Sequence, residues 1–218
     1  MADRALGAAL PRSAIGTAQG PVGVKLGGSV IRSRELESWL DAILHDRGRV
    51  VVVPGGGALA DEVRMSQSRL GFDDMAAHRM ALLAMDQLAW AVAGLRSCFD
   101  VVVNEAQLVR SLGAGRIPVW APYQLVANRA DIPQSWSVTS DSLAVWLAGR
   151  IGAPQCYLIK SIDRSFARIG AQELSRREIV DSAFPDMLRQ AGVSAFVLGR
   201  GDQAAFSSRS TMAGAIVE

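Results

Sequence analysis

Short apolar runs alternate with longer amphipathic segments along most of the chain. The apolar runs are rich in Val and Ile and lie at residues 22–26, 49–54, 100–104, 117–122, 155–160, 194–199 and 211–217. Between them, apolar residues recur every three or four positions, which predicts helices over residues 32–48, 58–70, 73–95, 140–152 and 180–192. Buried strands that alternate with helices are typical of right-handed βαβ units. The pattern therefore predicts an α/β fold with a mainly parallel sheet that helices cover on both faces.

Two helix ends carry recognisable capping residues. Gly48 suits the C-terminal cap of the first predicted helix, because glycine adopts the left-handed backbone that often ends a helix. Asp73 suits the N-terminal cap of the long helix over residues 73–95. Residues 1–20 are small and slightly basic and lack a continuous apolar stretch, so we expect a flexible N-terminal extension before one domain over residues 21–218.

Composition narrows the classes of function. The formal net charge of +2 gives no reason to expect a nucleic acid partner, which requires a concentrated basic face. Apolar runs stay shorter than the ~18 residues that a membrane helix requires, so no membrane partner is expected. Cys98 and Cys156 lie in or beside apolar runs without a CxxC spacing, which favours two reduced, buried thiols in a cytoplasmic protein.

Two glycine-rich turns follow predicted strands. The stretch KLGGS supplies Lys25, Gly27, Gly28 and Ser29, and the stretch PGGG supplies Gly55, Gly56 and Gly57. Ligands of open α/β sheets bind at the carboxyl ends of the strands, where glycines and helix N-termini accommodate anions. A tight turn alone also explains a glycine pair, but it needs only one glycine and not three. Neither turn has the GxxxxGK[ST] or GxGxxG spacing, so the sequence indicates a phosphate site of another design.

A third polar stretch opens the helix predicted over residues 140–152. Thr139, Ser140, Asp141 and Ser142 lie at its start. Simple N-capping explains the hydroxyl side chains equally well. Asp141 is more specific, because a carboxylate beside a lysine could hold the ammonium group in place or contact Mg²⁺.

Taken in order, KLGGS, PGGG and the Ser-Asp helix start resemble the amino acid kinase family over roughly residues 22–217. The resemblance implies a three-layer α/β/α sandwich, ATP with Mg²⁺ as cofactors, and transfer of the γ-phosphoryl group to an oxygen. Four segments, SWSVTSDSLAVWLA, PGGGALADEVR, AAHRMALLAMDQLAW and VDSAFPDML, resemble the branch that serves methanofuran biosynthesis. That branch converts [5-(aminomethyl)furan-3-yl]methyl phosphate to the diphosphate.

The resemblance also implies roles for residues. Lys25 would neutralise charge on the transferring phosphoryl group, and Asp141 would orient this lysine and contact the metal. The N–H groups of Gly27, Gly28, Gly56 and Gly57 would hold phosphates. The nucleotide set comprises Gly27, Gly28, Ser29, Lys160, Asp163 and Arg200. The acceptor set comprises Gly55, Gly56, Gly57, Arg64, His78, Thr139 and Ser140, with Arg79 and Trp136 as further candidates. Solvated or ordinary packing positions are the alternative for Arg64, His78, Arg79 and Trp136, and no residue is assigned as a dedicated metal ligand.

Two departures from the family leave alternatives open. The turn KSIDRS at residues 160–165 keeps Asp163 but lacks the first Asp and the Gly of a TDVDG-like turn, and VLGRGDQAAF lacks a late lysine. Lys160 and Arg200 are the cations that would compensate. The acceptor could also be isopentenyl phosphate, UMP or an amino acid carboxylate, although no histidine closely follows the glycine loop as in isopentenyl phosphate kinases. A non-catalytic binding subunit is a further alternative. In each case we expect a small-molecule ligand and a homo-oligomer.

Overall fold

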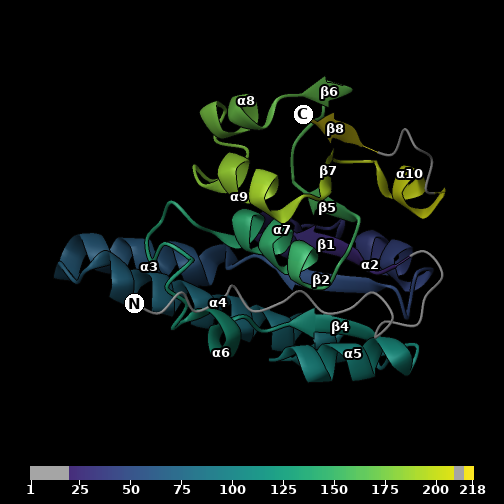
Figure 1. The fold of residues 1–218 in the computed structure, drawn as a ribbon, viewed down its shortest axis with the longest axis horizontal. Coiled ribbons are helices and arrows are strands. Elements are labelled where there is room, and N and C mark those ends of the chain that lie inside the picture. Colours follow the sequence, from purple (N-terminus) through teal and green to yellow (C-terminus); the bar gives the residue numbers. More distant parts are fainter. Residues whose placement is uncertain (1–19, 209–213) are drawn as a thin grey trace, which may run out of the picture.

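The computed structural model describes residues 20–208 and 214–218, and its centre is one eight-stranded sheet (Figure 1). The strands are β1 (Val22–Leu26), β2 (Val50–Pro54), β3 (Phe99–Val102), β4 (Ile117–Trp120), β5 (Gln155–Ile159), β6 (Arg168–Ile169), β7 (Ser194–Leu198) and β8 (Ala215–Val217). They follow the order β3-β4-β2-β1-β5-β7-β8-β6. Neighbouring strands are parallel except β7 and β8, which are antiparallel. The predicted α/β fold with a mainly parallel sheet is confirmed.

Helices cover both faces of this sheet (Figure 1). They are α1 (Gly28–Ile31), α2 (Leu36–Leu44), α3 (Gly57–Leu70), α4 (Asp74–Gly94), α5 (Glu105–Gly113), α6 (Tyr123–Val126), α7 (Ser140–Arg150), α8 (Ala171–Arg176), α9 (Phe184–Ala191) and α10 (Gln203–Ser208). Side chains of α7, α8 and α9 belong to one apolar core, and side chains of α2 and α10 belong to the other. The three-layer arrangement follows from these two cores.

The strand β2 shows why both faces of the sheet must be covered by helices. Val51 and Val53 lie in the core that contains α7, whereas Val50 and Val52 lie in the core that contains α2. Successive side chains of a strand point to opposite faces, so an uninterrupted valine run must be buried on both. All four valines are fully buried.

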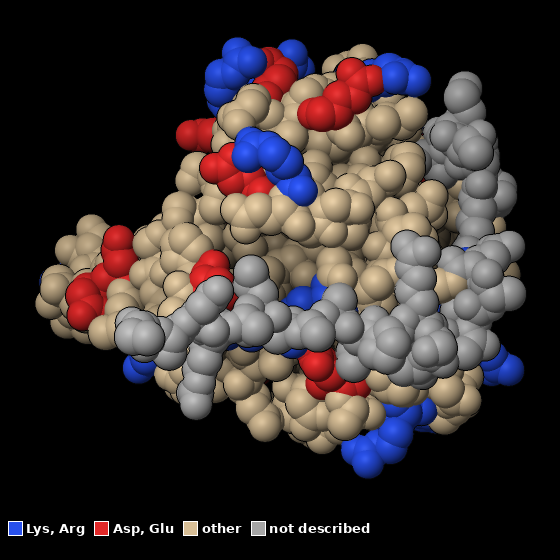
Figure 2. Space-filling view, viewed as in Figure 1, with Lys and Arg blue, Asp and Glu red and all other residues tan. Residues whose placement is uncertain are grey.

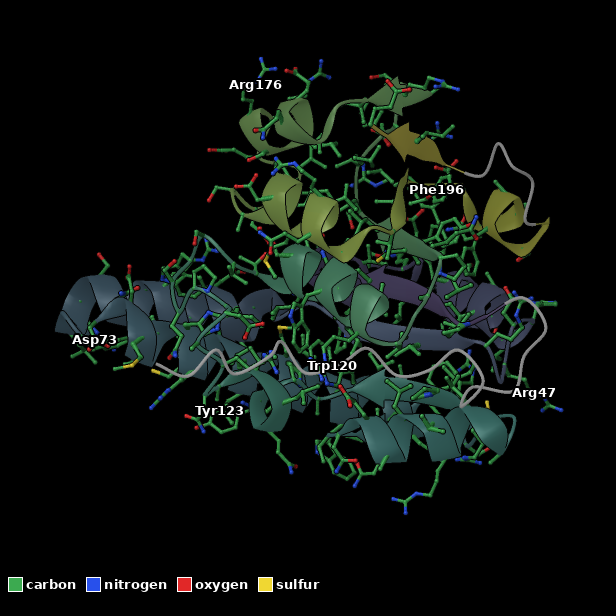
Figure 3. The ribbon with its side chains drawn as sticks, viewed as in Figure 1. Arg47, Asp73, Trp120, Tyr123, Arg176 and Phe196 are labelled. Atoms are coloured by element: carbon green, nitrogen blue, oxygen red, sulfur yellow. The ribbon has the colours of Figure 1, made fainter. Side chains whose placement is uncertain are left out.

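The long helix α4 begins as the sequence predicts. Asp73 accepts a hydrogen bond from the backbone N–H of Ala76 at 2.7 Å, which satisfies one of the free donors at a helix start. Figure 3 shows Asp73 at the end of α4 that projects beyond the sheet, beside α3. Among the described residues, no helix is long and apolar enough to cross a membrane.

The first predicted helix ends earlier than expected, so the assignment of Gly48 as its cap is wrong. Helix α2 stops at Leu44 with His45 as its cap. Gly48 has a φ of +79° and its N–H donates to the carbonyl oxygen of Arg116 at 3.0 Å. The left-handed glycine therefore shapes the turn into β2. Helix α5 is not among the helices that the pattern predicts. Of the flexible extension expected over residues 1–20, residues 1–19 lie outside the part of the chain that the structure describes.

The carboxyl ends of three adjacent strands meet the starts of three helices. β1 is followed by α1, and β2 is followed by α3. Helix α7 begins near the carboxyl ends of these strands, and the chain then continues into β5. The neighbouring strands β1 and β5 are in register, with Leu26 opposite Ile159. Residues that follow these two positions are consequently brought together, although they are far apart in the sequence.

Candidate active site

A buried carboxylate joins two lysine side chains where β1 and β5 end. Asp141 Oδ1 lies 2.9 Å from Lys25 Nζ, and Asp141 Oδ2 lies 2.6 Å from Lys160 Nζ. Lys25 and Asp141 are only 4% and 5% exposed. Lys160 also donates to the carbonyl oxygen of Ile179. The predicted contact between Asp141 and Lys25 is confirmed, whereas the second lysine was assigned to the nucleotide set without this contact.

The three charges strongly affect one another. Burial alone raises the pKa of Asp141, but the ammonium groups of Lys160 and Lys25 outweigh it and hold this pKa below its usual value. Burial lowers the pKa of Lys160 to about 8, with the positive charge of Lys25 acting in the same direction and Asp141 opposing it. One carboxylate thus faces two cations, so these three side chains together carry a net positive charge in a poorly solvated place. The carboxylate of Asp181 lies nearby, and burial together with the charge of Asp141 raises its pKa. A place where the two lysines outweigh Asp141 attracts an anion.

The two glycine loops touch each other through their backbones. A Cβ atom on Gly28 would lie 2.4 Å from the nitrogen of Gly57, and one on Gly55 would lie 2.6 Å from the nitrogen of Gly28. Gly57 also has a φ of +52°, which side chains rarely allow. Glycine is therefore required at these positions for loop packing as well as for access to a ligand.

The amide groups of two loop glycines are already engaged. The Gly27 N–H donates to the carbonyl oxygen of Ile159 at 3.0 Å, and the Gly55 N–H donates to that of Leu26 at 2.8 Å. The prediction that the Gly27 N–H holds a phosphate is therefore wrong in this geometry, because this N–H already donates its hydrogen bond to the carbonyl oxygen of Ile159 in β5. Gly28, Gly56 and Gly57 line the cavity described next.

The start of α7 is held by a carboxylate from elsewhere in the chain. Asp181 accepts from the N–H and Oγ1 of Thr139 at 2.9 and 2.8 Å and from the N–H of Ser142 at 3.1 Å. The Ser142 hydroxyl donates to its other oxygen. Thr139 is the N-cap residue, but its own side chain makes no capping bond. The simple N-cap interpretation of the Thr139 hydroxyl is therefore wrong, and Asp181 takes that role.

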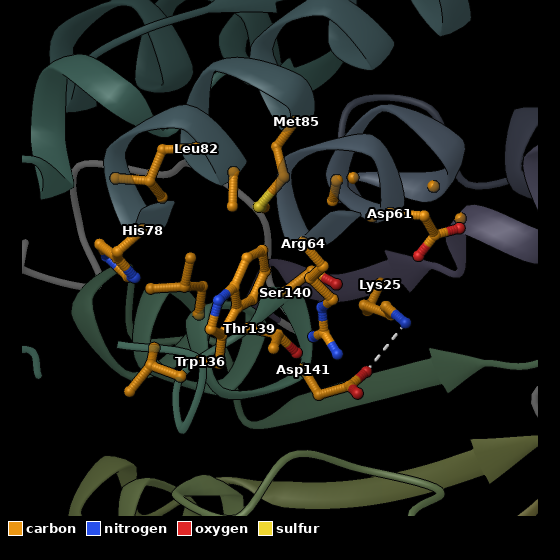
Figure 4. Close-up of a pocket in the computed structure, with 18 of the residues that line it drawn as sticks. Lys25, Asp61, Arg64, His78, Leu82, Met85, Trp136, Thr139, Ser140 and Asp141 are labelled. Carbon is orange, nitrogen blue, oxygen red and sulfur yellow. Dashed lines mark ion pairs between the residues drawn. The ribbon is translucent and has the colours of Figure 1, made fainter. Parts of the chain in front are cut away.

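A cavity of about 290 Å³ opens in front of Lys25 and Asp141 (Figure 4). Its polar lining contains all of the predicted acceptor set, namely Gly55, Gly56, Gly57, Arg64, His78, Thr139 and Ser140, together with Gly28 and Ser29 of the nucleotide set. Its apolar lining was not predicted and comes from Ala60, Ala81, Leu82, Met85, Val138 and Leu143, and Asp61 joins the rim. The walls of this cavity come from α3, α4 and the segment before α7.

A second cavity of about 580 Å³ adjoins the first. The two share Arg64, Trp136, Thr139 and Asp141, and Lys160 lines only the second. Lys25 lines only the first. The bridged carboxylate of Asp141 therefore stands between two cavities, with one ammonium group facing each.

Arg64 and Trp136 form a stacked pair at the junction of the two cavities. The guanidinium carbon of Arg64 lies 4.2 Å from the centroid of the Trp136 ring. The indole N–H of Trp136 donates to Gln67 Oε1 at 2.6 Å, which fixes the ring against α3. A stacked guanidinium keeps its edge free for an anion. The predicted placement of Arg64 on the side of the helix that faces inward is supported by this contact.

Three members of the predicted nucleotide set line neither cavity, namely Gly27, Asp163 and Arg200. Asp163 and Arg200 face each other at 3.3 Å on the surface, and neither belongs to the lining of either cavity. Their turns are tied together, since the Arg200 N–H donates to the carbonyl oxygen of Ile162. Arg79 donates to Asn128 Oδ1 at 3.4 Å and also lies outside both linings.

Carboxylates and cations are paired around this centre in the part of the chain that the structure describes. Each oxygen of Asp141 is within ion-pair distance of one lysine, so a metal ion at Asp141 would share the carboxylate with two ammonium groups, and the contact with Mg²⁺ stays a prediction. Over residues 20–208 and 214–218, no group of three or more His, Cys, Asp or Glu side chains could hold a metal ion. Positive charge at this centre is supplied by side chains.

This sheet, with its paired glycine loops and its lysine–carboxylate centre, matches a known class of phosphotransferase. The chain matches the amino acid kinase family over residues 24–168, about two thirds of its length, and it belongs to that family. Membership of a kinase family implies phosphoryl transfer and the use of ATP.

The relatives point to small-molecule kinases. The chain is 23% identical to [5-(aminomethyl)furan-3-yl]methyl phosphate kinase of Methanocaldococcus jannaschii over 188 residues, which are 80% of this chain and 86% of that protein. The fold of the present chain resembles the crystal structure of uridylate kinase from Archaeoglobus fulgidus, with a TM-score of 0.70 and 18% sequence identity. The match covers 91% of the present chain and 100% of the uridylate kinase chain. UMP kinase from Bacillus anthracis gives a TM-score of 0.65 at 18% identity, covering 91% and 95% of the two chains. These structures support the fold.

Proposed function

We propose that this protein is an ATP-dependent kinase that phosphorylates a small phosphate monoester to a diphosphate. The acceptor that we propose is [5-(aminomethyl)furan-3-yl]methyl phosphate, in the biosynthesis of a methanofuran-type cofactor in the cytoplasm. Family membership and the archaeal relative support this choice. The first cavity, about 290 Å³ in volume with apolar walls and a cationic end, suits a small ring that carries a phosphate.

The observation that carries the proposal is the position of the two lysines. Lys25 and Lys160 contact the same carboxylate and face different cavities. A kinase must bring two anions into contact and stabilise the charge that spreads over the phosphoryl group between them. We assign the acceptor phosphate to the cavity of Lys25 and the ATP phosphates to the cavity of Lys160.

The transfer step needs no general base. A phosphate monoester is largely dianionic at neutral pH, so one of its oxygens can attack the γ-phosphorus directly. The bond between the γ-phosphorus and the oxygen that bridges it to the β-phosphorus breaks, ADP leaves, and the acceptor becomes a diphosphate. Asp141 is unsuited to act as a base because two lysines hold its pKa low. Its role in this proposal is to position both ammonium groups.

The first experiment is an ATP-consumption assay of the purified chain with the furan phosphate, isopentenyl phosphate and UMP as acceptors. We expect turnover with the furan phosphate, and a loss of about 10²–10³ in kcat for Lys25→Ala, the size found when one donor to a transition-state anion is removed. Far-UV circular dichroism of the variant checks that the fold is kept.

Turnover with another acceptor alone would replace the furan assignment and leave the kinase assignment in place. Turnover with none of them, or a Lys25→Ala variant as active as the wild type, would contradict the proposed chemistry. Micromolar ATP binding in calorimetry would exclude the alternative of a non-catalytic subunit that no longer binds ATP.

A further inference from the structure

One buried side chain of the acceptor cavity has a polar atom that nothing in the protein satisfies. His78, on α4, is 3% exposed and lines the first cavity. Its Nε2 atom is buried and has no hydrogen-bond partner. Buried polar atoms are almost always paired, so an unpaired nitrogen on a cavity wall calls for a ligand group.

The chemistry of the ring decides which kind of group fits. A hydrogen bond with the backbone of Ser135 favours the charged form of His78, which means that the ring donates an N–H there. Because Nε2 is unpaired, the donor is Nδ1. Burial, the largest influence, lowers the pKa of His78, and the charge of Arg79 acts in the same direction. The ring is then neutral at pH 7, with a hydrogen on Nδ1 and a free lone pair on Nε2.

We propose that Nε2 of His78 accepts a hydrogen bond from an N–H donor at the end of the acceptor molecule remote from its phosphate. This proposal rests on the proposed function, since it takes the first cavity to be the acceptor site. In the furan phosphate the donor is the aminomethyl nitrogen. His78 is thereby a specificity-determining residue, and its role differs from the anion contact that the sequence predicts.

The arrangement of the cavity agrees with this assignment. In Figure 4, Lys25 and Asp141 lie at one end of the labelled residues and His78 lies at the other, with Arg64 and Trp136 between them. Leu82 and Met85 follow His78 along α4 and line the same cavity. A phosphate held by Lys25 and a ring beside Trp136 would direct the opposite substituent toward His78. A second phosphate there would meet a lone pair, because both groups are acceptors.

The test compares two ligands that differ by one group. Calorimetry without ATP measures binding of the furan phosphate and of its analogue with methyl in place of aminomethyl, to the wild type, His78→Phe and His78→Gln. We expect the wild type to bind the amino compound about 10–100-fold more tightly, the range for a hydrogen bond that involves a charged group. In His78→Phe this preference should fall below about threefold, and His78→Gln should restore part of it because its amide oxygen accepts.

A second measurement reads the ring directly. Nitrogen-15 NMR of the labelled histidine rings reports which nitrogen carries the hydrogen. The other histidine is His45, whose Nδ1 lies 2.8 Å from the carbonyl oxygen of Asp41 in an exposed contact, so His45→Gln assigns the signals. We expect an unprotonated Nε2 that shifts when the amino compound is added and not with the methyl analogue.

Failure of this inference can be told apart from failure of the proposed function. A preference that persists in His78→Phe, or a protonated Nε2, overturns the inference while ATP turnover still supports the kinase. Binding that depends on His78 without phosphoryl transfer supports the inference and overturns the function. Absence of binding by both furans overturns the inference and the furan acceptor, while the kinase assignment is decided by the turnover assay.

Discussion

Lys160 lines the second cavity, with its ammonium group bonded to Asp141 and to the carbonyl oxygen of Ile179. These bonds leave one of its three hydrogens for a ligand. The ammonium group of Lys160 also loses its proton at a lower pH than an ordinary lysine, since burial lowers its pKa to about 8. A nucleotide phosphate that binds here would stabilise the charged form.

The low pKa of Lys160 predicts an alkaline limit to activity. As pH rises through about 8, the free enzyme loses the proton of Lys160, so kcat/KM for ATP should decline there. Lys160→Arg keeps a charge at every accessible pH, and its lower activity should show no such decline below about pH 9.5. The measurement is a pH profile of kcat/KM for both proteins. A wild-type profile that stays flat over this range would contradict the assignment.

Lys25 and Asp141 could be predicted from the sequence because each lies directly beside an element boundary. Lys25 is near the end of a valine-rich strand, and Asp141 is in the first turn of a helix. That Lys160 shares the carboxylate of Asp141 with Lys25 could not be predicted, because it depends on the pairing of β1 with β5, which no local pattern states. Residues on helix faces, such as Leu82 and Met85, look alike in sequence whether they line a cavity or fill a core.

Helix α7 depends on a residue that is far from it in the sequence. Its first turn carries Asp141, and the four donors of Thr139 and Ser142 converge on the carboxylate of Asp181. Asp181 precedes α9, so a hydrogen-bonded contact joins the two helices at their starts. In sequence, Asp181 resembles an ordinary capping residue of α9, and nothing in the pattern points toward α7.

Removal of this carboxylate should loosen the start of α7. Asp181→Ala leaves several donors without a partner, and we expect a loss of about 1–3 kcal/mol in the free energy of unfolding, measured by urea denaturation. Activity should fall with it, because Asp141 loses its support. Asp186→Ala, which removes an exposed ion pair with Arg189 in α9, is the matched control and should change stability little. Equal effects of the two changes would contradict the role of Asp181.

At the scale of the molecule, charged side chains are dispersed over the surface in view, whereas the large exposed apolar side chains of the described residues are concentrated on two helices. Figure 2 shows basic and acidic side chains interspersed over the face in view, with wide uncharged areas between them. The large apolar side chains that are exposed among the described residues all lie between Leu59 and Leu95, on α3, α4 and the cap of α4. Met80, Leu83 and Trp90 fall on one side of α4, because they are spaced by three and seven positions. An exposed stripe of this kind marks an interface.

We propose that this stripe pairs with the same stripe of a second copy, which would provide an interface for the homo-oligomer expected from the sequence. Trp90 is 69% exposed, so a charge there should not disturb the core. We expect Trp90→Glu to raise the dimer dissociation constant by at least about tenfold in sedimentation equilibrium, as for a central aromatic contact. Gln190→Glu adds the same charge on α9 and should leave association unchanged. A wild-type chain that is monomeric at micromolar concentration would contradict the proposal.

The register between β1 and β5 has a consequence for how this enzyme can diverge. Leu26 and Ile159 are opposite each other in neighbouring strands, and the lysines that face the two cavities flank these positions. Lys25 is opposite Leu158, two positions before Lys160, so the offset between the two lysine backbones is set by the spacing of neighbouring strands, roughly 4.8 Å, together with the rise of two residues along a strand, and it does not depend on loop length. Insertions in the segment before α7, or substitutions along α4, can therefore exchange one acceptor for another while the distance between the reacting anions is conserved.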